Sequence, residues 1–221
     1  MVEAGEYPQL AKCIFYWLNY HSSVSNSDVL LESAVRFPLA EFIERRLQVP
    51  VVLESRHPDF DRLRVDFCYS VNGVKRNIEL KFLHDYSDRE AEFKRFFDDI
   101  VRLALLDGTN YFILCGSQSL YRSKILKEQM TFQEKRIPID GEQRIVKRSR
   151  FEAILALAKE GCVAEFNPHD MYGYIGEAKN EYKQSRQIPQ ELQNVHTQLV
   201  AKEDTEVEGS QVVYIWRITR K

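Results

Sequence analysis

The stretch Leu63–Phe82, LRVDFCYSVNGVKRNIELKF, predicts a β-hairpin around which the rest of the chain is organised. Two runs of alternating apolar and polar residues flank Asn72-Gly73. This pair favours a type I′ turn, because both of its central positions need a positive φ. With these two residues as the loop, Val71 lies opposite Val74. The same register then places Asp66 opposite Glu79 and Arg64 opposite Lys81.

Alternate residues of the hairpin separate into an apolar and a polar face, because neighbouring side chains of a strand point to opposite sides. The apolar face contains one charged residue, Arg76, and we expect it to face the core. Its other members are Leu63, Val65, Phe67, Tyr69, Val71, Val74, Ile78, Leu80 and Phe82. The polar face carries Asp66, Glu79 and Lys81. Opposed Cβ atoms are about 4.5–5.5 Å apart, so the two carboxylates repel each other unless a cation, such as a divalent metal, lies between them.

Composition limits the classes of protein to which this chain can belong. Its 221 residues are 44% hydrophobic, which is enough for one domain with a real core. The 33 acidic and 31 basic residues give a net charge of −2, so any surface that binds nucleic acid must be local. No apolar run has the length of a membrane span, and the N-terminus lacks the order of a signal peptide. We therefore expect a cytoplasmic protein with no membrane partner.

The cysteines agree with that location. Their wide spacing matches no zinc-binding pattern, and we expect reduced thiols at Cys13, Cys68, Cys115 and Cys162.

Helical and strand patterns alternate on both sides of the hairpin. Before it, the chain predicts helices over 8–20 and 28–47, the second interrupted by Pro38, and a strand over 49–54. After it, we expect a helix over 88–106, a strand over 110–115 buried on both faces, and a helix over 117–130. The order predicts an α/β fold, with a mixed central β-sheet flanked by helices.

The last third of the chain is less regular. It predicts a loop over 137–141, a basic stretch over 143–150, a helix over 151–160, a strand over 163–166, a polar loop or partly disordered stretch over 177–210, and a strand over 212–219. We expect a single domain over 1–221. It would comprise a core over 28–130, an N-terminal helical extension over 1–27 and a C-terminal elaboration over 131–221.

The charged residues of the hairpin resemble the motif of the PD-(D/E)XK, or restriction-endonuclease-like, nuclease superfamily. The resemblance depends on Asp66 and on Glu79-Leu80-Lys81 in the context IELKF. An acid-bearing helix precedes them, and a long helix and a buried strand follow, so that about residues 28–115 are covered. Val65 stands where the family has a proline. The resemblance implies a restriction-endonuclease-like core with the order αβββαβ.

The resemblance also implies roles for individual residues. Asp66 and Glu79, helped by the Leu80 carbonyl, would hold Mg²⁺ or Mn²⁺, and Lys81 would orient or help deprotonate the attacking water. A glutamate of the preceding helix often joins such a site. Glu32 is the first choice, because ESAVR resembles the family's Glu-x-x-x-Arg, and Glu41 is the second. The implied activity is that of a metal-dependent endonuclease that hydrolyses phosphodiester bonds of nucleic acid, with DNA expected first.

Other interpretations of the same residues stay open. Asp66, Glu79, Lys81 and Arg64 would also form a balanced, solvated network of charges. A catalytically inactive module with the nuclease fold, binding nucleic acid or a protein partner, would carry the same pattern. A third hypothesis is an assembly role in which the N-terminal helix is an interface, and this hypothesis leaves a homodimer open.

Two further groups of residues are candidates for binding. Four basic residues could contact the phosphates of a nucleic acid, namely Arg144, Lys147, Arg148 and Arg150. The default interpretation of such a run of charges is a solvated surface. Histidines could bind a metal, but none has a partner at ligand spacing, and polar or surface roles are expected for His57, His84 and His169.

Overall fold

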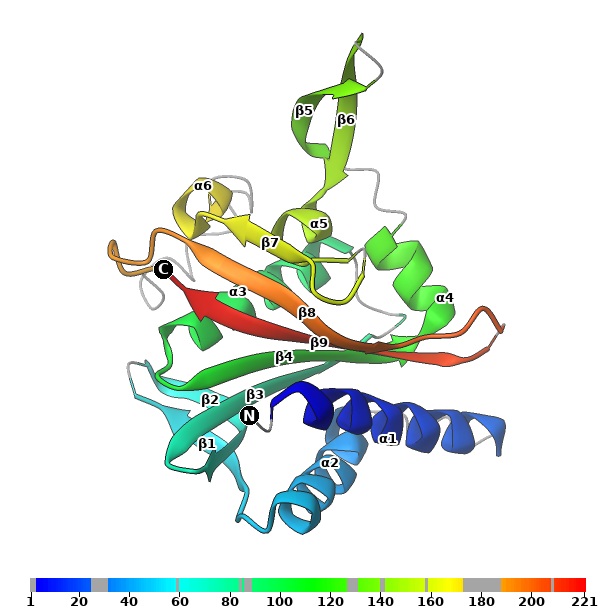
Figure 1. Cartoon of the computed structure of the whole chain (residues 1–221), viewed down its shortest axis with the longest axis vertical. Helices are drawn as coiled ribbons and strands as arrows, with labels where there is room; N and C mark the ends of the chain where they lie inside the picture. The colour runs from blue at the N-terminus through cyan, green and yellow to red at the C-terminus, as the bar shows by residue number, and fades with distance from the viewer. Residues whose placement is uncertain are drawn as a thin grey trace.

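The computed structural model describes residues 3–24, 32–58, 60–83, 85, 89–126, 131–139, 142–157, 159–172, 188–207 and 209–221. Its centre is a seven-stranded mixed sheet with the order β1-β2-β3-β4-β9-β8-β7 (Figure 1). Helices cover both faces. The strands are β1 (Val52–His57), β2 (Phe60–Val71), β3 (Val74–Phe82), β4 (Thr109–Ser117), β7 (Val163–Phe166), β8 (Val195–Glu203) and β9 (Gln211–Arg220). The expected α/β class, with helices around a mixed sheet, is confirmed.

The hairpin of β2 and β3 forms around the predicted turn. Asn72 and Gly73 both have positive φ, at 52° and 77°. The predicted register holds from Val71 opposite Val74 to Phe67 opposite Ile78.

Beyond that pair the two strands separate, and the predicted pairing of Asp66 with Glu79 and of Arg64 with Lys81 is wrong. Arg64 is instead aligned with Arg56 of β1, and Lys81 is aligned with Leu114 of β4. The separation arises because β2 follows its antiparallel partner β1, whereas β3 continues beside its parallel partner β4.

A helical crossover connects β3 to β4. Helix α3 (Arg89–Leu105) leads to Gly108, whose φ is 99°. A Cβ at Gly108 would lie 2.2 Å from the Lys75 carbonyl oxygen, so only glycine fits there. Strand β4 then runs parallel to β3 and antiparallel to β9. The predicted strand over 110–115 and its burial on both faces are confirmed.

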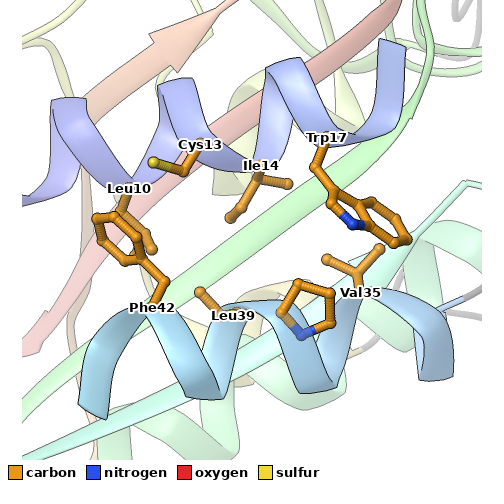
Figure 2. Close-up of a pocket in the computed structure, with 8 residues that line it drawn as sticks. Leu10, Cys13, Ile14, Trp17, Val35, Leu39 and Phe42 are labelled. Carbon is orange, nitrogen blue, oxygen red and sulfur yellow. The ribbon is translucent and has the colours of Figure 1, made fainter. Parts of the chain in front are cut away.

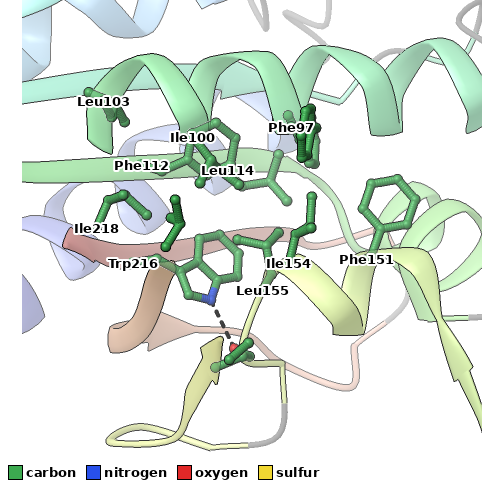
Figure 3. Packing of buried hydrophobic residues seen from close by; sticks show 14 of the residues in the cluster. Phe97, Ile100, Leu103, Phe112, Leu114, Phe151, Ile154, Leu155, Trp216 and Ile218 are labelled. Carbon is green, nitrogen blue, oxygen red and sulfur yellow. Dashed lines mark hydrogen bonds between the residues drawn. The ribbon is translucent and has the colours of Figure 1, made fainter. Parts of the chain in front are cut away.

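Each face of the sheet has its own core. On the α3 side, aromatic and aliphatic side chains pack around Trp216, whose indole N–H donates to the Ala156 carbonyl at 2.8 Å (Figure 3). On the other side, helices α1 (Glu3–Ser23) and α2 (Glu32–Leu47) cover a second core. Phe67 and Tyr69 belong to this second core, as predicted. Val65 packs on the α3 side, contrary to the prediction, because the face of β2 changes where the strand leaves β3.

Helix α1 is part of that second core. It begins earlier than predicted, packs against β8 and β9, and buries Tyr7, Leu10, Ala11, Ile14 and Leu18. Arg76, the charged residue of the predicted core face, is buried there and forms an ion pair with Glu6 of α1 at 2.6 Å. Helix α2 continues through Pro38, and its expected start at residue 28 lies outside the described residues.

The last third of the chain departs most from expectation. Strands β5 (Thr131–Ile139) and β6 (Glu142–Ser149) form a ribbon that projects from the body on the α3 side (Figure 1), so the loop expected over 137–141 is wrong for residues 137–139. Helix α5 (Arg150–Ile154) is shorter than predicted. Strand β8 lies inside the stretch expected to be a polar loop. The predicted strands over 163–166 and 212–219 are confirmed as β7 and β9.

The helix expected over 117–130 is only partly described. A short α4 (Gln118–Leu120) continues into the π-helical turn η2 (Tyr121–Leu126). A further short helix, α6 (Pro168–Tyr172), follows β7. None of the described helices combines the length and the apolar character needed to cross a bilayer.

Candidate functional site

Charged side chains from α2, β1, β2, β3 and α3 gather where β2 and β3 separate. Asp66 and Glu79 are the most enclosed strand residues of this cluster, with side chains 6% and 7% exposed. The full cluster, called the charged cluster below, comprises Glu32, Arg36, Glu54, Asp66, Glu79, Lys81, Asp99 and Arg102. The structure therefore brings the predicted residues Asp66, Glu79, Lys81 and Glu32 into one region.

The Asp66 carboxylate lies at the point of separation. Its Oδ2 accepts a hydrogen bond from the Leu80 backbone N–H at 2.8 Å, and its Oδ1 accepts one from Arg36 Nη2 at 2.5 Å. The Asp66 side chain of β2 thus accepts the Leu80 N–H of β3, which a backbone carbonyl would accept in a continuous antiparallel ladder. This contact also brings the Leu80 backbone, predicted to take part in a metal site, beside Asp66.

On the α2 side, Arg36 is the shared partner of three carboxylates. It donates to Glu32 Oε1 at 2.8 Å and also contacts Glu54, in addition to Asp66. Glu54 has a φ of 53°, an uncommon conformation for a residue other than glycine. The first-choice helix glutamate, Glu32, therefore belongs to the charged cluster.

The second choice, Glu41, does not. It is exposed and pairs with Arg45 on its own helix at 2.7 Å. Arg64 is exposed and forms no ion pair with the charged cluster among the described contacts; it donates only to the backbone carbonyl of Glu54, at 3.0 Å.

On the α3 side, four side chains form a closed ring of ion pairs. Lys81 Nζ lies 3.2 Å from Glu79 Oε1 and 3.1 Å from Asp99 Oδ2. Arg102 Nη2 lies 3.4 Å from Glu79 Oε1 and also contacts Asp99. Because the ring joins β3 to α3, the position of Lys81 depends on both elements.

The electrostatic environment of the site raises the pKa of Asp66 and leaves the charged cluster with an excess of negative charge. Burial, and then the nearby Glu79, raise the pKa of Asp66 from 3.8 to about 7, although the Leu80 N–H, Arg36 and Lys81 act to lower it. The charged cluster holds five carboxylates and three cationic groups, an excess of two negative charges when all are ionised. A divalent cation would be opposite in sign to this excess and equal to it in size.

The carboxylates of the charged cluster are the groups that could hold a metal ion. Among the residues that the structure describes, no group of three or more His, Cys, Asp or Glu side chains is arranged to hold a metal. Instead, basic side chains contact oxygens of Asp66 and Glu79. Two carboxylates at the separation of the strands suit Mg²⁺ or Mn²⁺, because Mg²⁺ commonly uses one or two carboxylates and keeps several waters.

Sequence reasoning missed four members of the charged cluster, namely Arg36, Glu54, Asp99 and Arg102. Only Arg36 had a local signal, since it follows Glu32 by one helical turn in ESAVR. The other three come from β1 and α3, and no short-range pattern relates those elements to the hairpin.

The remaining predicted residues lie elsewhere. Arg144, Lys147 and Arg148 are in β6 and Arg150 begins α5, but the side chains of these four residues lie outside the described part of the chain, as does His84. The buried ring of His57 has its Nε2 3.2 Å from the Arg102 carbonyl oxygen, next to the charged cluster.

An apolar cavity of about 160 Å³ lies between α1 and α2, and no residue of the charged cluster is among those that line it. Side chains of both helices point toward one another across it (Figure 2). It is lined by Leu10, Cys13, Ile14, Trp17, Val35, Pro38, Leu39 and Phe42. Burial raises the pKa of the Cys13 thiol, which makes a reactive thiolate less available. The described lining of this cavity thus consists of apolar side chains and the Cys13 thiol.

Comparison of the chain with protein-family models, curated proteins and solved structures finds no match. The assignment of a function therefore depends on the geometry of the charged cluster and on the order of the elements around it.

Proposed function

We propose that this protein is a divalent-metal-dependent nuclease that hydrolyses phosphodiester bonds of nucleic acid, with DNA as the first substrate to test. The observation that carries the proposal is the gathering of Asp66, Glu79 and Lys81 where β2 and β3 separate. The sequence resemblance gives roles in the reaction to these three residues and, as the first-choice helix glutamate, to Glu32.

The order of the elements supports the same proposal. Helix α2, strands β1, β2 and β3, helix α3 and strand β4 follow one another, with β1, β2 and β3 antiparallel and β4 parallel to β3. This order agrees with the αβββαβ core that the resemblance implies. We therefore infer a restriction-endonuclease-like core, extended across the sheet by β9, β8 and β7.

The residues of the charged cluster would divide the work of hydrolysis. Asp66 and Glu79 would hold Mg²⁺ or Mn²⁺ beside the Leu80 backbone. Such an ion, when bound, lowers the pKa of a water ligand and offsets the negative charge that develops on the phosphate. The Lys81 side chain is 20% exposed, so its ammonium group can donate to a water or to a phosphate oxygen at the rim of the site.

The test compares two lysines of the same strand. Plasmid DNA, single-stranded DNA and RNA are incubated with the wild-type protein, Lys81→Ala and Lys75→Ala, in Mg²⁺, Mn²⁺ or EDTA. Lys75 is exposed near the hairpin turn, so its loss controls for removal of a β3 charge. We expect cleavage only with metal, a rate at least about 100-fold lower for Lys81→Ala, and no such loss for Lys75→Ala. Equal cleavage by the wild-type protein and Lys81→Ala, or none by either, refutes the catalytic proposal.

One observation favours a second candidate, a catalytically inactive module with the same fold. Asp66 and Glu79 already have basic partners within the protein, so these ion pairs account for their burial without a metal. Titration calorimetry with Mn²⁺ separates the two candidates. Heat of binding that disappears in Glu79→Gln supports the nuclease, whereas no heat, together with metal-independent binding of nucleic acid, supports the inactive module.

A further inference from the structure

We infer that Asp99 and Arg102 of α3 are positioning residues, which hold Lys81 and Glu79 in the arrangement that the proposed nuclease reaction requires. Their role in catalysis rests on the proposed function, but the arrangement itself can be tested without it. Neither residue belongs to the motif that the hairpin carries.

The geometry of the ion-pair ring gives Lys81 two anchors. Its ammonium lies between Glu79 at 3.2 Å and Asp99 at 3.1 Å, and Arg102 joins the two carboxylates from the other side. A lysine side chain has four carbons and many rotamers, so a single carboxylate partner leaves its position poorly defined. Two partners from different elements restrict the ammonium to one place.

Helix α3 is itself firmly held, which makes Asp99 a rigid anchor. Phe96 and Ile100, on either side of Asp99 along the helix, are fully buried, and Phe96 packs edge-to-face on Phe112 of β4 with ring centroids 5.3 Å apart. The Asp99 side chain is only 6% exposed. Supporting groups fixed in this way are what keep catalytic side chains within a fraction of an ångström of their working positions.

Removal of Asp99 has a specific expected consequence. Lys81 and Arg102 would both keep Glu79 as their remaining partner in the ring, and would compete for the carboxylate oxygens needed by a metal. Asp99→Asn should therefore lower kcat with little change in KM for the nucleic acid. It should also weaken Mn²⁺ binding. A residue that only stabilised the fold would lower the melting temperature without this pattern.

The first experiment reads the arrangement directly, in the full chain without metal or substrate. The ¹⁵Nζ resonance of the Lys81 ammonium is recorded by NMR in the wild-type protein, Asp99→Asn and Asp98→Asn. A lysine ammonium held by two ion pairs exchanges its protons slowly enough to be observed. We expect the signal in the wild-type protein and in Asp98→Asn, a matched loss of charge at the neighbouring helix position, and its disappearance in Asp99→Asn. A signal unchanged in Asp99→Asn overturns the inference.

The second experiment separates positioning from charge balance. Asp99→Asn and the double variant Asp99→Asn/Arg102→Gln are compared for kcat, KM and Mn²⁺ affinity. The double variant removes one negative and one positive charge, so the net charge of the ring is the same as in the wild-type protein. Because no arginine is left without its Asp99 partner, this variant is also expected to fold where Asp99→Asn alone does not. We expect at least a tenfold loss of kcat in both variants. Recovery in the double variant would show that Asp99 only neutralises Arg102 and would overturn the inference. If the wild-type protein neither cleaves nor binds Mn²⁺, the proposed function fails, and the NMR experiment still decides whether the ring positions Lys81.

Discussion

Replacement of Asp66 by asparagine should change how the stability of the protein depends on pH. Burial and the neighbouring Glu79 raise the pKa of Asp66 to about 7, whereas the unfolded chain has a value near 3.8. The folded state therefore binds the proton more tightly than the unfolded state. The contribution of this group to stability is complete below about pH 4 and is lost as the pH rises through about 7. Asparagine does not titrate and can still accept the hydrogen bond from the Leu80 N–H.

The magnitude follows from the same two values. Each tenfold change in the acid dissociation constant is worth about 1.4 kcal/mol, so the full loss is about 4 kcal/mol, of which about 3 kcal/mol falls between pH 5 and pH 8. For a chain of this size, about 3 kcal/mol corresponds to about 6–12 °C in melting temperature. Relative to the wild-type protein, Asp66→Asn should gain that much between pH 5 and pH 8.

The assay is differential scanning calorimetry in EDTA from pH 5 to pH 8. Asp107→Asn is the control, because its side chain is almost fully exposed and should give a nearly constant difference from the wild-type protein across this range. A difference between Asp66→Asn and the wild-type protein that stays constant, or that falls as the pH rises, refutes the reasoning from burial. Added Mg²⁺ should raise the melting temperature of the wild-type protein at pH 8 more than that of Asp66→Asn, since the ion would offset the charge that the variant lacks.

Three further predictions concern the fold. Gly108→Ala should lower the free energy of unfolding by about 3 kcal/mol in urea titrations, because its Cβ would clash with the Lys75 carbonyl oxygen at 2.2 Å in addition to the strain of positive φ. Gly161→Ala also has a positive φ but open space around it, so it should lower the free energy of unfolding by only about 1 kcal/mol. Equal losses in the two variants would contradict this reasoning. Arg76→Met should lower the free energy of unfolding by about 3–5 kcal/mol, because it leaves the largely enclosed Glu6 side chain without its ion pair. Adding Glu6→Gln to this variant should recover part of the lost stability. If nothing is recovered, the loss comes from packing and not from the unpaired charge. Trp216→Phe removes the hydrogen bond to the Ala156 carbonyl and leaves a cavity, so the free energy of unfolding should fall by about 2 kcal/mol in thermal unfolding. An unchanged melting temperature would contradict this expectation.

Local sequence patterns were enough to predict several of the central elements of the fold. Asn72-Gly73 between alternating runs predicted the turn, the two strands and five of their cross-strand pairs, because a two-residue loop leaves one register. The helical periodicity of 88–106 predicted α3, and the apolar run of 110–115 predicted β4. Both patterns are local, because they show which side chains of a single element are buried. Strand β8 also had a readable alternation of buried residues, Val195, Thr197, Leu199 and Ala201, which its polar neighbours obscured.

The sequence by itself determined which side chains could do chemistry, since Asp66, Glu79 and Lys81 lie within one hairpin whose turn and periodicity are local properties. Only the tertiary structure decided how these groups meet. The pairing of the two strands ends at Phe67 and Ile78, so that Asp66, which precedes Phe67, contacts the Leu80 backbone instead of facing Glu79 across a ladder. Their partners come from other elements, with Arg36 from α2 and Asp99 from α3. Contacts of this kind depend on how helices pack on a twisted sheet, and no spacing along the chain encodes that packing.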